Sequence, residues 1–172
     1  MRSYVVAVPS IRRAGRSGGY YELMMQSPTN GLLLTRQGMH DDISLDVAIR
    51  RGALAFATRV YVNESQLRSE TAKLMLALKQ AFNAIESTQI QLAFGPQITH
   101  SPSLGISIRF DRLGHVRMGV SMVAEFLDGA PPIGSDTCTI NLVSDLASLD
   151  SFAAQLSSMS DYASSTAHFV AE

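Results

Sequence analysis

The feature that most constrains the fold of this chain is an alternation of apolar and polar residues that recurs in separate segments. In the longest series every second residue is apolar, namely Val116, Met118, Val120, Met122, Ala124 and Phe126. Successive side chains of a β-strand point to opposite sides, so this series predicts a strand with one buried and one solvated face. Shorter series predict further strands over residues 43–49, 90–94, 106–110 and 137–143. Such a chain is expected to build a mainly antiparallel sheet.

Turn-forming residues predict how neighbouring strands are joined. Gly52 and Gly114 each follow an alternating segment, and Pro28 and Asn30 lie in another turn-rich stretch. Glycine tolerates a positive φ, and proline and asparagine favour turns, so each site predicts a hairpin. The predicted hairpins pair residues 43–49 with 53–62, 106–110 with 116–126, and 20–26 with 32–35.

Helical spacing replaces the alternation in two places, over residues 67–85 and 149–159, where apolar residues recur on one side of a helix. The candidate N-caps are Asn63 or Ser65 for the first helix and Asp145 or Ser148 for the second. We therefore predict an α+β fold in which about eight to nine mainly antiparallel strands pack with two amphipathic helices. Both halves read as strands followed by a helix, which hints at duplication.

The length and segment pattern predict a single α+β domain over residues 1–160. Residues 1–40 are expected to add strands and a flexible Arg/Gly loop at 12–19. Residues 161–172 are rich in Ser and Ala and are expected to fray.

Charge excludes several classes of protein. Charged residues make up 17% of the 172 residues, against about 25% in an average globular chain, and the formal net charge is -1. This balance gives no general attraction to nucleic acid or to an anionic membrane. No apolar run approaches the roughly 20 residues of a membrane span. The first ten residues lack a signal-peptide core, and the lone Cys138 fits a reducing compartment, so we expect a soluble cytoplasmic protein.

The residues that could carry chemistry are dispersed. Four histidines and one cysteine form no zinc-binding set, and Cys138 falls on the inward side of its strand. The basic segment at 12–16 lacks the Lys-Ser/Thr ending of a phosphate loop, and Ser17 has no base in its neighbourhood that the sequence identifies. We therefore predict no catalytic, metal or cofactor site.

The acidic residues Asp41, Asp42 and Asp46 are the candidate site, with Asp46 expected on the solvated face of its strand. They could perform acid/base chemistry, bind a divalent cation or pair with basic groups of a partner. The simpler interpretation is that they are solvated residues of a turn and a strand end.

Taken in order, three segments resemble WapI-type bacterial immunity proteins: the acidic strand at 41–47, the helix at 67–82 and the Asp-Arg-Leu-Gly-His-Val turn at 111–116. The similarity spans about residues 41–160, although the family's common Trp near the acidic strand is absent. It implies a non-catalytic protein that binds and neutralises a cognate toxin domain. Because the chain has no Trp, the expected partner-binding residues are tyrosines, arginines and the group Asp41, Asp42 and Asp46.

Two other functions stay open. The charge-poor surface could serve a structural or assembly subunit that forms a homo-oligomer. An enzyme of unfamiliar mechanism is the third alternative, and a deep pocket with clustered His, Asp or Glu would favour it.

Overall fold

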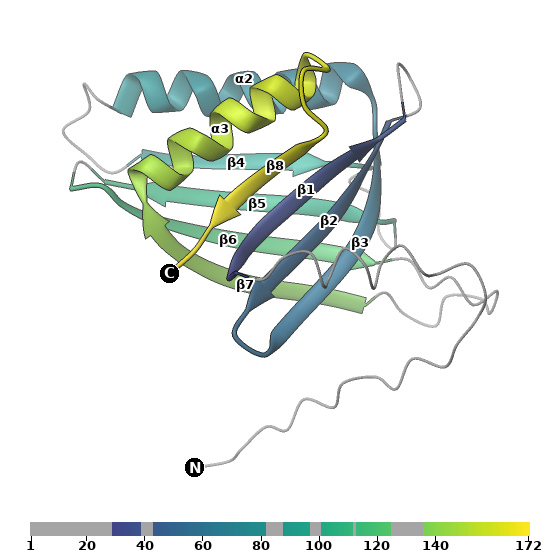
Figure 1. Cartoon of the computed structure of the whole chain (residues 1–172), viewed down its shortest axis with the longest axis horizontal. Coiled ribbons are helices and arrows are strands. Elements are labelled where there is room, and N and C mark those ends of the chain that lie inside the picture. The colour runs from purple at the N-terminus through teal and green to yellow at the C-terminus, as the bar shows by residue number, and fades with distance from the viewer. Residues whose placement is uncertain (1–28, 39–42, 82–87, 97–100, 112, 125–135) are drawn as a thin grey trace, which may run out of the picture.

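The computed structural model describes residues 29–38, 43–81, 88–96, 101–111, 113–124 and 136–172. These residues form two antiparallel four-stranded sheets and two helices, which confirms the predicted α+β class (Figure 1). The elements are β1 (Gly31–Gln37), β2 (Ile43–Arg51), β3 (Leu54–Val62), α2 (Glu64–Ala81), β4 (Thr88–Phe94), β5 (Ser103–Phe110), β6 (His115–Ala124), β7 (Asp136–Asp145), α3 (Leu146–Ser160) and β8 (Thr166–Val170).

The two sheets enclose a single core. Sheet A has the strand order β3-β2-β1-β8, and sheet B has the order β4-β5-β6-β7. Their strands cross at a steep angle, and the two helices lie side by side over one end of the sheets (Figure 1). Four phenylalanines are the largest fully buried side chains, and they come from both sheets and from α3: Phe94, Phe110, Phe152 and Phe169. The core therefore joins both sheets and the helices into one unit.

The element order is a repeat of β-β-β-α-β, which agrees with the duplication that the sequence hints at. The first copy runs from β1 to β4 and the second from β5 to β8. In each copy the first three strands form a meander, and the last strand leaves that meander to pair with the first strand of the other copy. Strand β4 pairs with β5, and β8 pairs with β1. The two copies thus exchange one strand each.

The helix before each exchanged strand caps that strand's outer edge. Glu70 of α2 accepts a hydrogen bond from the backbone N of Ala93 in β4 at 3.1 Å. Gln155 of α3 accepts one from the backbone N of His168 in β8 at 2.8 Å. An edge strand otherwise presents unpaired backbone groups, so these side chains satisfy donors that a neighbouring strand would otherwise bind.

Local predictions hold at the helix starts. The Asn63 Oδ1 atom accepts a hydrogen bond from the backbone N of Gln66 at 2.8 Å, and Asp145 Oδ1 accepts one from Ser148 N at 2.7 Å. Asn63 and Asp145 are therefore the N-caps, and the cap bond to Ser148 lowers the pKa of the Asp145 carboxyl. No helix in the ranges described above is long and apolar enough to cross a membrane.

Two sequence predictions are wrong. Residues 32–35 cannot form a hairpin with 20–26, because both edges of β1 are already paired, with β2 on one side and β8 on the other. The tail at 161–172 contains β8 and is not frayed: Ala167 and Phe169 alternate onto the buried side of sheet A. A five-residue strand leaves too short an alternation to recognise in a Ser/Ala-rich segment.

Candidate functional site

The outer faces of the two sheets differ in accessibility. On the central strand β2 of sheet A, the outward residues Ser44, Asp46 and Ala48 are buried. The outward residues of sheet B are all exposed or partly exposed. Among the described residues, sheet B therefore presents an outer face that is accessible on all four strands, and we call it the sheet B outer face.

The expectation that Asp46 lies on a solvated face is wrong. Its side chain is only 3% exposed and forms a bidentate ion pair with Arg59, which lies directly opposite on β3. Arg59 Nε lies 2.5 Å from Asp46 Oδ1, and Arg59 Nη2 lies 2.9 Å from Asp46 Oδ2. The carboxylate thus joins β2 to β3 and is not available to a partner. Asp41 and Asp42 lie outside the described residues.

The sheet B outer face consists almost entirely of small or uncharged polar residues. They are Gln89, Gln91 and Ala93 on β4; Ser103, Gly105, Ser107 and Arg109 on β5; His115, Arg117, Gly119, Ser121 and Val123 on β6; and Thr137, Thr139, Asn141, Val143 and Asp145 on β7. A solvated sheet face usually carries many charged side chains, whereas the centres of protein interfaces are depleted of them.

The charged residues of that set are Asp145 at the end of β7 and two arginines, and the two arginines lie opposite one another. Arg109 on β5 pairs in register with Arg117 on β6, and both are exposed. Like charges directly opposite on a sheet repel, so this placement lowers the stability of the fold unless an opposite charge neutralises the arginines. Neither arginine forms an ion pair within the described residues; Arg109 Nη2 donates to Gln89 Oε1 at 3.2 Å. We call Arg109 and Arg117 the arginine pair.

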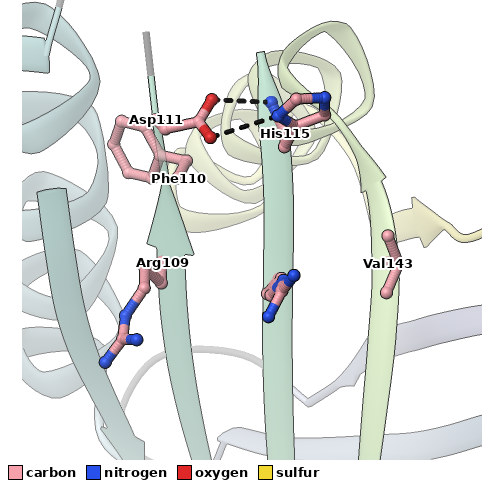
Figure 2. Close-up of a pocket in the computed structure, with 6 residues that line it drawn as sticks. Arg109, Phe110, Asp111, His115 and Val143 are labelled. Carbon is pink, nitrogen blue, oxygen red and sulfur yellow. Dashed lines mark hydrogen bonds and ion pairs between the residues drawn. The ribbon is translucent and has the colours of Figure 1, made fainter. Parts of the chain in front are cut away.

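The turn beside the arginine pair is held by Asp111. Its Oδ1 atom accepts a hydrogen bond from the backbone N of Leu113 at 2.9 Å. The same atom accepts one from the backbone N of His115 at 3.2 Å, and the Oδ2 atom lies 3.1 Å from His115 Nδ1 (Figure 2). The side-chain bond from His115, followed by the backbone bonds, lowers the pKa of the Asp111 carboxyl. The Arg109 side chain extends away from Asp111 and His115 (Figure 2). Asp111 is therefore committed to the turn.

A shallow hollow of about 340 Å³ lies where this turn meets the outer face. Its lining residues are Arg109, Phe110, Asp111, His115, Arg117 and Val143. Two exposed apolar side chains lie in this region: Val143, which borders the hollow and is 45% exposed, and Leu113 at the tip of the turn, which is 76% exposed. Apolar groups next to arginine are typical of protein-binding sites.

Other predicted residues have structural places or lie outside the described ranges. Cys138 is partly buried on β7, where burial raises the pKa of its thiol, in agreement with the prediction that it faces inward. Ser17, His40 and His100 lie outside the described ranges, as does the basic segment 12–16. Within the described part of the chain, no three His, Cys, Asp or Glu side chains gather in a way that could hold a metal ion.

The sequence interpretation missed the arginine pair, although a signal for it was present. Arg109 and Arg117 are each four positions from Leu113, near the centre of the predicted 111–115 turn. In a hairpin, residues equidistant from the turn face one another, and both occupy polar positions of the alternation. Applying the register to the predicted hairpin would have placed them side by side.

Comparisons of this chain with protein-family models, with curated proteins and with solved structures found no match.

Proposed function

We propose that this chain is a non-catalytic immunity protein, which docks a cognate bacterial toxin domain on the sheet B outer face and thereby blocks it. We place its action in the cytoplasm of the cell that makes the toxin or of a sibling cell. The observation that carries the docking proposal is the accessible, charge-poor face of sheet B, next to exposed Leu113 and Val143. The toxin as partner is suggested by the sequence resemblance to WapI-type immunity proteins.

The physical argument for docking rests on what the face would lose on contact with a partner. Serine, threonine and glycine lose little side-chain entropy on burial, and uncharged groups cost less to desolvate than ions. Gly105 on β5 supports this argument, because a Cβ there would meet its nearest neighbours only at 3.8 and 3.9 Å. The interior therefore does not require glycine at this position, and its absent side chain lets another backbone approach closely.

The alternative function is an assembly subunit in which the same face binds a second copy of the chain. A measurement of mass against protein concentration separates the two functions. A stable closed homo-oligomer that forms without any toxin would favour the assembly subunit.

Co-expression with toxin-like products of neighbouring genes tests the immunity proposal. The chain should restore growth and co-purify with one toxin. Ser121→Arg, which places a long charged side chain in the centre of the sheet B outer face, should abolish both effects. Ala154→Arg, at an exposed position of α3, is the matched control and should protect like the natural chain. Failure to rescue growth from any such toxin would refute the immunity proposal, and full protection by Ser121→Arg would refute docking on this face.

A further inference from the structure

We propose that the arginine pair, Arg109 and Arg117, anchors carboxylates of an acidic segment in a protein partner. This inference rests on the proposed docking at the sheet B outer face and adds the chemistry of the partner. It is carried by two arginines that pair in register on an exposed face and have no carboxylate partner within the described residues.

The other arginines of the described residues have internal roles. Each donates to an oxygen atom of the chain: Arg36 to Met159 O, Arg50 to Gly52 O, Arg51 to Asn141 O, Arg59 to Asp46 and Arg68 to Glu64. Arg109 binds only the neutral Gln89 side chain, and Arg117 has no hydrogen bond among the residues that the structure places. Among the described arginines, Arg109 and Arg117 are thus the two for which no bond to a backbone carbonyl or carboxylate oxygen is found.

The nearest carboxylates along the sheet do not neutralise the arginine pair. Asp111 accepts hydrogen bonds from two backbone N–H groups and lies against His115, and Asp145 accepts the cap bond at the start of α3. Both are therefore engaged by donors of their own elements. A carboxylate brought by a partner can form charge-assisted bonds with either guanidinium fork.

The surroundings favour a short acidic protein segment over a nucleic acid. Two cations neutralise few phosphates, so the arginine pair alone provides little of the charge that binds a nucleic acid. Among its described residues, the sheet B outer face has no Phe, Tyr or Trp side chain on which a base could stack. The exposed apolar Leu113 and Val143 instead suit the aliphatic side chains of a protein.

The test uses the whole chain labelled with ¹⁵N and three probes: a hexaglutamate peptide, inorganic phosphate and a twelve-base-pair DNA duplex. The peptide should shift the Arg109 and Arg117 Nε–H resonances in a saturable way, and salt should weaken the effect. Arg117→Gln should weaken peptide binding about tenfold, the equivalent of one charge-assisted contact. Lys79→Gln, which removes an exposed positive charge from α2, is the control and should leave binding within about twofold of the natural chain.

Three results would overturn the inference: equal weakening by Lys79→Gln, phosphate or DNA binding as tight as that of the peptide, or unchanged arginine resonances at millimolar peptide. These results are separable from failure of the immunity proposal. A toxin still neutralised by the Arg109→Gln, Arg117→Gln double variant would leave docking intact and remove the arginine anchor. Saturable peptide binding without any toxin partner would keep the anchor and remove the toxin.

Discussion

Breaking the Asp46–Arg59 pair should have a cost that depends strongly on which partner is removed. The Asp46 side chain is 3% exposed, whereas the Arg59 side chain is 39% exposed. Arg59→Met leaves an ionised carboxylate in a nearly dry site, and removal of one partner from a buried pair costs about 3–5 kcal/mol. Because Arg59 itself reaches solvent, water can enter where its head group was. We therefore expect Arg59→Met to lower the free energy of unfolding by about 3 kcal/mol, the low end of that range.

Asp46→Asn should cost less, about 1.5 kcal/mol, because Arg59 keeps its contact with water and one neutral hydrogen-bond acceptor. The double variant removes the buried charge together with its partner, so it should lose about 2.5 kcal/mol, well below the sum of the single losses. The coupling energy of about 2 kcal/mol measures the pair itself.

Urea unfolding followed by far-UV circular dichroism measures these free energies, and the chain has no Trp that would report by fluorescence. Arg68→Met is the matched control, because it breaks the Arg68–Glu64 pair on α2, in which the side chains are 56% and 30% exposed. That loss should stay below about 0.5 kcal/mol. If Arg59→Met costs no more than Arg68→Met, burial of Asp46 does not control the energy and the reasoning fails.

Three further predictions concern glycine, histidine and the arginine pair. Gly31→Ala should lower the free energy of urea unfolding by about 2–4 kcal/mol, because φ is +149° and a Cβ there would overlap a carbonyl oxygen of β8. Gly52→Ala, at φ +59° with open space around it, should lower it by about 1 kcal/mol. Equal losses for the two variants would contradict the role of the overlap. Burial lowers the pKa of His168, whose Nε2 has no hydrogen-bond partner among the described residues, so the unfolded chain takes up a proton first as pH falls. Stability should therefore drop from pH 7.5 to 5.5, less so in His168→Gln, and equal drops would exclude His168 as the cause. Arg117→Gln should raise the free energy of unfolding by a few tenths of a kcal/mol at low salt and by less at high salt; a loss instead would assign Arg117 a structural role.

Alternation predicted the strands of sheet B and the β2–β3 hairpin because each of these strands has one face in the core. It could not predict which sheet each strand joins, because pairing of β4 with β5 and of β8 with β1 depends on contacts between the two copies of the repeat. The same limit explains the wrong hairpin at residues 20–26 and 32–35. Turn residues indicate a reversal of the chain, but they do not show that both edges of β1 are already paired.

The candidate site was predicted less well than the fold, and Asp46 shows why. Its position on the polar side of an alternating strand is the same as that of a solvated residue, and only the pairing of β2 with β3 brings Arg59 opposite. A charge pattern within one strand therefore cannot distinguish a free carboxylate from a paired one. The arginine pair lies on two strands joined by a short turn, so its geometry was accessible from the sequence through the hairpin register.

The repeated architecture provides two comparable sheet faces, and the two copies use them differently. In the first copy, Asp46 and Arg59 oppose one another across its second and third strands, and the charges satisfy each other. Across the corresponding strands of the second copy, Gly119 opposes Asn141, Arg117 opposes Val143 and His115 opposes Asp145, and no ion pair joins these two strands within the described residues. The first face therefore stabilises the fold through its own contacts, whereas the arginine pair of the second face gains a carboxylate partner only from outside the described residues. Since the core lies on the other side of sheet B, the outer face can change with little effect on folding, which is the condition a binding surface requires.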